Sequence, residues 1–263
     1  MWDSTDTAIG IAARTTNDQR RTTNNAFMPL DILALAAHRD DVEQTCGGTL
    51  LKMAERGYRT GILDLTQGEM GTRGTAEDRA REAAEAARIL KVSWRHALAI
   101  PDGRVENTWE NRLKVVRVLR EQRPRVLILP YWEGRHPDHY TASILGYEAA
   151  FLSGLAKLPL EGPAHRPFKI IYASLYRDVR PTFVVDITDQ FETRFAALMA
   201  YKSQFTDQDA GSGIFPAQKE IRARIESMAR YYGMFGGVTY AEPFVQKEIG
   251  LVDDVMAIPV KSI

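Results

Sequence analysis

The sequence predicts an α/β fold in which a mostly parallel sheet is covered by helices on both faces. Short apolar runs alternate with amphipathic helical stretches between residues 30 and 130. Polar residues and glycines follow these runs where the chain turns into the next helix. Alternation of this length is typical of parallel strands joined by helical crossovers. The chain has 263 residues, 44% of them hydrophobic, and we expect a single domain.

The first elements are a strand, a polar turn and a helix. Residues 30–37 (LDILALAA) are an apolar run of strand length, and a glycine pair opens the helical stretch TLLKMAERG. Gly57 stands where a C-terminal glycine cap ends such a helix. Residues 58–66 predict a second strand and the Ala- and Glu-rich residues 76–90 predict the next helix.

The alternation continues through the rest of the chain. We expect strands over residues 95–99, 125–130, 169–176 and 182–188, and helices over residues 111–122 and 190–202, with a polar loop over residues 207–215. This order indicates a Rossmann-like domain. In such open sheets ligands bind beyond the carboxyl ends of the strands.

The N-terminal residues 1–27 differ in composition from the rest. They are rich in Thr, Asn, Arg and Asp, and they contain neither the apolar stretch nor the cleavage pattern of a secretory signal. We expect a disordered extension followed by one folded domain over residues 28–263. Met28 directly precedes the first predicted strand and is therefore a second candidate for the native start.

Charge and cysteine content restrict the class of partner. The 34 basic and 34 acidic residues cancel, so no overall field would attract nucleic acid or an anionic membrane. No apolar run approaches the roughly 20 residues that span a bilayer. The single cysteine, Cys46, excludes an intrachain disulfide. We expect a cytoplasmic protein with a small-molecule substrate and neither nucleic acid nor membrane as partner.

Two short segments concentrate the residues that bind metals. HRDD at 38–41 and HPDH at 136–139 contain three of the five histidines and three aspartates, and each follows the end of a predicted strand. A hydrolytic zinc site needs about three nitrogen or carboxylate ligands and one open position, where bound water becomes acidic. We predict His38, Asp41 and His139 as ligands of Zn2+.

The remaining residues of these segments match the other needs of hydrolysis. We predict Asp40 as the general base and His136, protonated by its setting, as the group that stabilises the oxyanion and gives a proton to the leaving amine. Asp138 would fix the tautomer of a histidine. Asp40 and Asp41 have an alternative explanation as a helix N-cap pair.

Other acidic and histidine side chains have ordinary structural explanations. Glu43 lies in the first turn after the metal segment, where a carboxylate is favoured for capping. His96 and His165 lack polar neighbours of the same kind in sequence. We therefore expect all three to be structural.

These motifs resemble the PIG-L or LmbE-like zinc N-deacetylases from residue 28 almost to the C-terminus. The resemblance rests on AHRDDVE followed by GG, LTQGEMGTRGT, EDRAREAAEAARIL, PDG, RHPDH and GGVTYAEPF. It is strongest to the bacillithiol-pathway branch, which deacetylates N-acetylglucosaminyl malate. The family roles fall on the same metal and catalytic residues, with substrate arginines at Arg79 and Arg135. The resemblance also implies an amino-sugar substrate and a homo-oligomer, a trimer or hexamer.

Two positions depart from the family pattern. Arg39 replaces the proline of the common form AHPDD, and Ile221 stands where some relatives have a tyrosine. The first leaves the metal residues intact. Because of the second departure, the sequence does not identify the residues that form the acyl or malate pocket.

A glycine-spaced loop, GEMGTRG, precedes the helix that contains Arg79. It has neither GxGxxG nor GxxxxGK spacing, so we interpret it as a substrate loop with Glu69 and Arg73 facing the site. Arg79 and Arg135 suit a carboxylate such as that of malate, although Arg79 also has i,i+4 partners on its helix. Tyr240 and Glu242 would close the rim of the site or pack at a strand edge.

Two other functions stay open at this level. One is a zinc amidohydrolase that acts on another small amide or a thiol S-conjugate. The other is a non-catalytic sugar-binding module, which would be expected to lose the base. The presence of Asp40 favours an enzyme.

Overall fold

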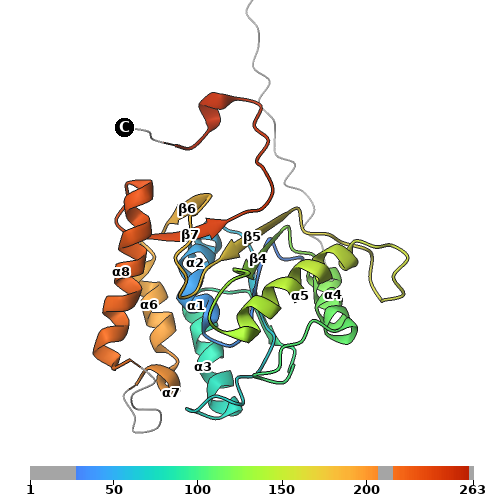
Figure 1. The fold of residues 1–263 in the computed structure, drawn as a ribbon, viewed down its shortest axis with the longest axis horizontal. Helices are drawn as coiled ribbons and strands as arrows, with labels where there is room; N and C mark the ends of the chain where they lie inside the picture. The colour runs from blue at the N-terminus through green and yellow to red at the C-terminus, as the bar shows by residue number, and fades with distance from the viewer. Residues whose placement is uncertain (1–27, 207–215, 261–263) are drawn as a thin grey trace, which may run out of the picture.

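A computed structural model describes residues 28–206 and 216–260, which form one seven-stranded sheet with helices on both faces (Figure 1). The predicted extension over residues 1–27 and the predicted loop over residues 207–215 lie outside the described residues. The strands are β1 (Ile32–Ala36), β2 (Thr60–Asp64), β3 (Trp94–Ala97), β4 (Val126–Pro130), β5 (Lys169–Ala173), β6 (Phe183–Asp186) and β7 (Ala241–Val245).

The sheet has the order β3-β2-β1-β4-β5-β7-β6. The first five strands of this order pair in parallel, whereas β7 pairs antiparallel with both β5 and β6. The predicted α/β class and mostly parallel sheet are therefore confirmed. The antiparallel end was not predicted, because the partner of β5 and β6 comes late in the chain, after α8.

The helices differ from the predicted ones mainly in number. They are α1 (Asp41–Thr45), α2 (Gly47–Glu55), α3 (Ala76–Ile89), α4 (Trp109–Gln122), α5 (Pro137–Ser153), α6 (Phe191–Met199), α7 (Lys202–Phe205) and α8 (Gln218–Gly236), with a short 3-10 helix at Val255–Ala257. The predicted helix over residues 190–202 ends early, and α7 follows as a separate turn. Helices α5 and α8 were not predicted from the sequence.

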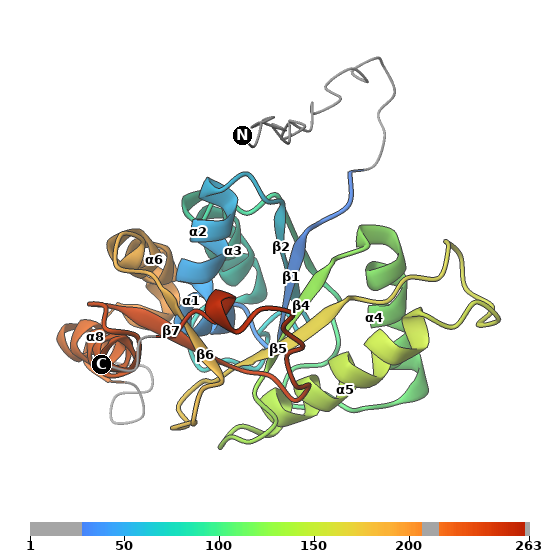
Figure 2. The same cartoon turned by 90° about the horizontal axis from the view of Figure 1, so that it is seen from above.

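The two faces of the sheet are covered by different helices, as the view along the sheet shows (Figure 2). Side chains alternate along a strand, so Leu33 and Leu35 of β1 pack with α4 and α5 while Ile32 and Ala34 pack with α1 and α2. Helices α3 and α6 extend the second face through a smaller cluster around Leu51. Both faces of β1 are therefore buried, as expected for a central parallel strand.

Strands β1 and β4 lie side by side at the point where the strand order reverses. From β1 the chain continues to β2 on one side, and from β4 it continues to β5 on the other. Such a reversal opens a crevice at the carboxyl ends of the two strands. The segments HRDD and HPDH follow these two ends.

Glu242 of β7 joins the antiparallel strands to α2. Its carboxylate accepts hydrogen bonds from Gly48 N at 2.9 Å and Thr49 N at 2.7 Å, and Arg194 Nε lies 3.1 Å away. A side chain at position 48 would meet the Glu242 carboxylate at 2.9 Å, which explains the glycine. Glu242 is 1% exposed, so the rim role considered for it is wrong. Glu242 has a packing role, although β7 lies between β5 and β6 and not at the edge of the sheet.

Tyr240, the other residue considered for the rim, packs at the first residue of α6. Its ring stacks on Phe191 with centroids 4.0 Å apart, and its hydroxyl bonds Glu226 of α8 at 2.9 Å.

Within the described residues, no helix combines the length and apolar composition that crossing a membrane requires.

Candidate active site

The turn after β1 has an unusual backbone at Asp40. Its φ of 102° lies in the left-handed region, which costs a non-glycine residue about 1–3 kcal/mol and recurs at functional sites. The turn is closed by a hydrogen bond of 2.9 Å from His38 N to Asp41 Oδ2. Because of this turn, Asp40 and Asp41 project differently although they are adjacent in sequence.

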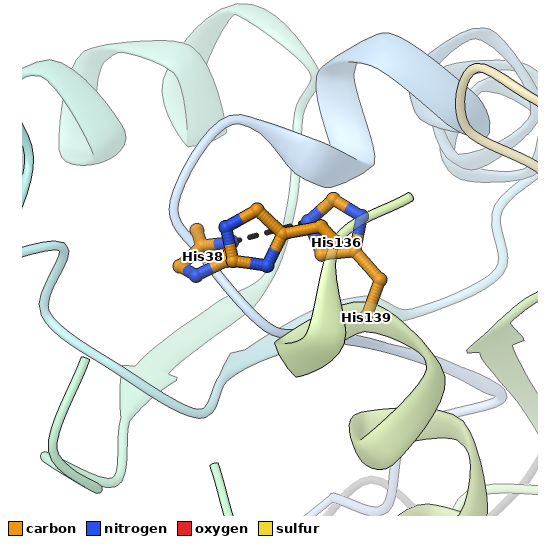
Figure 3. A group of neighbouring side chains, drawn as sticks. All are labelled: His38, His136 and His139. Carbon is orange, nitrogen blue, oxygen red and sulfur yellow. Dashed lines mark hydrogen bonds between the residues drawn. The ribbon is translucent and has the colours of Figure 1, made fainter. Parts of the chain in front are cut away.

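Three side chains from the two predicted segments bring their donor atoms together. His38 Nδ1 lies 3.2 Å from His139 Nε2 and 3.6 Å from an Asp41 oxygen, and His139 Nε2 lies 3.3 Å from the other Asp41 oxygen. Figure 3 shows the imidazoles of His38, from the loop after β1, and His139, from the first turn of α5, turned toward each other. Two imidazoles and one carboxylate are an ordinary donor set for zinc.

The electrostatics of this group favour positive charge. Burial by itself lowers the pKa of His38, but contacts with Asp102, Asp138 and Asp41 outweigh burial and raise this pKa to about 12. For His139, burial again opposes the charge, and Asp41 raises the pKa above its ordinary value. A place where protons are held this firmly also suits a divalent cation, so the donor set and the field both fit a metal.

His136 is the third imidazole of the cluster (Figure 3). Its ring centroid lies 4.7 Å from that of His38 and 4.8 Å from that of His139. Its Nδ1 accepts a hydrogen bond of 3.2 Å from Asp138 N and so caps α5. Burial and the two neighbouring imidazoles lower the pKa of His136. This direction is opposite to the one expected for His136 from its sequence setting. In the neutral ring, the cap on Nδ1 leaves Nε2 to carry the proton.

Two carboxylates contact His38 on its other nitrogen. Asp138 Oδ2 lies 3.3 Å and Asp102 Oδ1 lies 3.1 Å from His38 Nε2. Asp138 is itself fixed by hydrogen bonds from Gly103 N at 2.9 Å and Val105 N at 3.2 Å. His38 is thus oriented by carboxylates on the Nε2 side while its Nδ1 faces His139.

Asp102 is a site residue that the sequence analysis missed. It belongs to the PDG turn after β3, and an aspartate in such a turn has an ordinary structural explanation. The PDG motif contributes to the family resemblance, but its spacing in the sequence does not predict a position beside His38. Parallel pairing of β2 with both β1 and β3 brings the turn to the same edge of the sheet.

Asp40 lies beside the metal-binding group and is held on both oxygens. Arg79 donates to Oδ1 at 3.0 Å, and Gln44 Nε2 donates to Oδ2 at 3.4 Å. Burial raises the pKa of Asp40 to about 7, Arg79 opposes this rise, and the Asp41 charge adds to it. A carboxylate with such a pKa can accept and release a proton near neutrality.

The two predicted substrate arginines lie in different environments. Arg79 is buried, and its guanidinium donates to the Arg39 carbonyl as well as to Asp40. Arg135 is exposed, with its guanidinium over the Tyr176 ring at 4.7 Å from the centroid. Only Arg135 therefore lies at the surface of the site.

The glycine loop and Arg39 connect the metal turn to α3. Arg39 donates to the Ala76 carbonyl at 2.8 Å, so this side chain ties the turn to the start of α3. Arg73 does not face the site as predicted, because it is buried and donates to the Gln204 carbonyl at 3.1 Å. Glu69 accepts a hydrogen bond of 2.8 Å from Asp102 N, and so supports the PDG turn.

Glu43 does not cap its helix. The carboxylate is fully buried, with Arg95 Nη1 at 2.6 Å and the Tyr201 hydroxyl at 3.2 Å, so Glu43 is structural but joins a buried ionic network instead. His165 bonds the Pro124 carbonyl at 2.7 Å. In the described part of the chain, neither His96 nor His165 belongs to a cluster able to hold a metal.

Comparison with known proteins shows that this chain is similar to deacetylases, both in a family model and in a curated relative. The family model described as PIG-L, GlcNAc-PI de-N-acetylase, matches residues 33–150, a range that includes both histidine segments. The diacetylchitobiose deacetylase of Thermococcus kodakarensis is 31% identical over 224 residues, which cover 80% of each chain.

Solved structures agree with this result. A conserved protein from Thermus thermophilus is 43% identical with a TM-score of 0.77, and the match covers 85% of this chain and 98% of that one. The N,N'-diacetylchitobiose deacetylase from Pyrococcus horikoshii, solved with an inhibitor, is 27% identical with a TM-score of 0.71 and covers 81% and 82%.

Proposed function

Because the chain belongs to the PIG-L family of LmbE-like de-N-acetylases, we propose that it is a zinc-dependent hydrolase that removes the acetyl group of a small N-acetylglucosamine conjugate. The observation that carries the proposal is the arrangement at the end of β1. Asp41 contacts both imidazoles, while the adjacent Asp40 is turned to Arg79 and is left available for proton transfer.

His38, Asp41 and His139 would hold the metal. Zinc bound there would polarise the amide carbonyl and make water acidic. Asp138 and Asp102 would keep the His38 ring oriented, since both contact its Nε2, as carboxylates beside metal-binding histidines commonly do. Two histidines and a carboxylate also bind iron or cobalt. The identity of the metal as zinc is therefore itself part of the proposal.

Asp40 and His136 would do the proton and charge chemistry. Asp40 takes a proton from the attacking water, for which its raised pKa of about 7 is suitable. His136 donates a hydrogen bond from Nε2 to the oxyanion that develops on the amide oxygen. The lowered pKa of His136 makes it a poor proton source, so we assign the proton of the leaving amine to Asp40. Acetate and the free amino sugar are the products.

A small cavity beside the metal-binding group supports an acetyl substrate. It has a volume of about 20 Å³, is bordered by Asp41 and His139, and is otherwise lined largely by apolar groups such as Val42 and Leu175. A volume of this order holds about one water-sized group. We expect N-acetyl substrates to react faster than N-propionyl or N-butyryl analogues.

For the sugar conjugate, we propose N-acetylglucosaminyl malate, the substrate of bacillithiol biosynthesis in the branch that the sequence most resembles. The exposed Arg135 is the side chain that would bind the malate carboxylates. The similar deacetylases that act on diacetylchitobiose support an amino sugar in general. Another small amide, or a thiol S-conjugate, is the alternative.

Acetate release tests the proposal directly. The purified zinc-loaded protein would be incubated with N-acetylglucosaminyl malate, diacetylchitobiose and plain N-acetylglucosamine. Faster release from the malate conjugate, lost in Arg135→Ala, supports the full proposal. Faster release from diacetylchitobiose or the plain sugar would reject the malate assignment. No release from any of them, with sugar binding retained, would favour a non-catalytic sugar-binding module.

We also propose a cytoplasmic homo-oligomer, either a trimer or a hexamer. The segment after β7 exposes large apolar side chains, with Ile249 98%, Leu251 94% and Met256 87% exposed. Helix α5 exposes four more at helical spacing, namely Tyr140, Ile144, Tyr147 and Phe151. Clusters of exposed large apolar side chains are typical of interfaces between proteins.

A further inference from the structure

The loop after β5 reaches across to two other elements near Asp40. The Tyr176 hydroxyl donates a hydrogen bond to Gln44 Oε1 of α1. The Arg135 guanidinium lies over the Tyr176 ring, and Arg177 Nη2 forms an ion pair of 3.0 Å with Glu133. The loop is therefore tied both to α1 and to the segment that precedes α5.

Gln44 connects this loop to the proposed base. Its amide accepts from Tyr176 through Oε1 and donates to Asp40 Oδ2 through Nε2 at 3.4 Å. A hydroxyl that donates must face the oxygen end of an amide. The Tyr176 hydroxyl therefore determines that the NH2 end of Gln44, and not its oxygen, faces the Asp40 carboxylate.

The second oxygen of Asp40 is held independently by Arg79, which donates to Oδ1. The carboxylate is thus fixed between a cation on one side and an amide on the other. A general base must lie within hydrogen-bond reach of the proton that it accepts, so its orientation affects turnover.

Tyr176 adopts an unusual backbone for a bulky side chain. Its φ is 56°, in the left-handed region, which costs about 1–3 kcal/mol and persists only where surrounding contacts hold it. The residue is 58% exposed, so burial in the core does not explain this conformation. The contacts with Gln44 and Arg135 are the interactions that hold the ring over the site.

We propose that Tyr176 and Gln44 are positioning residues that act in series on Asp40, with the phenol orienting the Gln44 amide and the amide orienting the carboxylate. The inference rests on the proposed function, because Asp40 needs orientation only as the base. Neither residue touches the predicted metal ligands through its side-chain hydrogen bonds in the series.

The test is a double-mutant cycle with Tyr176→Phe, Gln44→Leu and the double variant. Tyr176→Phe removes only the hydroxyl and keeps the ring for Arg135. We expect each single variant to lower kcat about tenfold with KM within about twofold of wild type, the scale of one lost hydrogen bond. If the two residues act in series, loss of the Tyr176 hydroxyl has no further effect once Gln44 is replaced. The kcat of the double variant should therefore equal that of Gln44→Leu.

The controls separate this inference from the proposed function. Tyr58→Phe removes a tyrosine hydroxyl just before β2, at the opposite end of the strand from the site, and should leave kcat unchanged. Bound zinc, measured by elemental analysis, should be equal in all variants. An active wild type with additive losses, unchanged kcat, or raised KM alone would overturn the positioning role. A wild type that releases no acetate would instead reject the proposed function, and this inference with it.

Discussion

The Arg79 guanidinium lies 3.0 Å from Asp40 Oδ1, although 39 positions separate the two residues in sequence. Arg79 comes from the first turn of α3 and Asp40 from the turn after β1. Gly68, with φ of +73°, packs so closely on Arg79 that a side chain there would meet the guanidinium at 2.8 Å. The arginine that the family resemblance assigns to the substrate is thus the cation that pairs with the proposed base.

Replacing Arg79 with Gln should lower kcat by about 10- to 100-fold. The change removes the charge beside Asp40 and the donor to the Arg39 carbonyl, and truncating one partner of a buried charge pair is costly. Steady-state kinetics with N-acetylglucosaminyl malate and plain N-acetylglucosamine would measure it. A rise in KM for the malate conjugate alone, with kcat preserved, would instead assign Arg79 to the substrate carboxylate.

Replacing Asp40 with Asn should preserve bound zinc and reduce turnover about 100-fold or more, the usual scale of a general base. The amide keeps the size of the side chain but cannot take the proton of water. Zinc content and acetate release would be measured on the same preparation. Full activity in a zinc-loaded variant would remove Asp40 from the mechanism.

Replacing His139 with Ala should lower the zinc content of the dialysed protein, because one of three proposed ligands is lost. The matched control is His96→Ala, since His96 is exposed and, among the described residues, belongs to no group able to hold a metal. Elemental analysis after dialysis gives the metal content of each. Equal zinc in the two variants would contradict the assignment of His139 as a ligand.

Replacing Glu242 with Ala should destabilise the protein by about 3–5 kcal/mol, because the buried Arg194 and two amides of α2 lose their partner. Urea unfolding followed by circular dichroism measures the change. Glu220→Ala, which breaks an exposed pair with Arg224, should change the free energy of unfolding by no more than about 1 kcal/mol. Similar losses of unfolding free energy in both variants would show that the contacts of Glu242 with Arg194 and α2 do not stabilise the protein more than an exposed ion pair does.

Replacing Leu251 with Asp should reduce the mass of the particle in solution. A carboxylate in an apolar interface loses hydration without gaining a partner. Light scattering coupled to size-exclusion chromatography would compare it with wild type. Association that survives this change and a second one, Met256→Asp, would place the interface elsewhere.

Much of the site was predictable because most of its reactive residues are close together in the sequence. His38, Asp40 and Asp41 share one turn, and His136, Asp138 and His139 share another, so composition alone indicated a metal site. The alternation of strands and helices then put both turns at one edge of the sheet. Asp102 could not be found in this way, because the PDG turn that contains it has an ordinary structural explanation. Gln44 lies only four positions after Asp40, but no property of the sequence shows that its amide contacts both Asp40 and the distant Tyr176.

The sequence by itself determined the α/β class, the two histidine segments and the family, because periodicity and motif spacing are properties of neighbouring residues. Only the tertiary structure decided that Arg79 and Arg73 are buried, that Glu242 clamps α2, and that the pKa of His136 is lowered. Burial and charge–charge distance depend on residues far apart in the chain. They arise only when the sheet brings the ends of β1, β3 and β4 together.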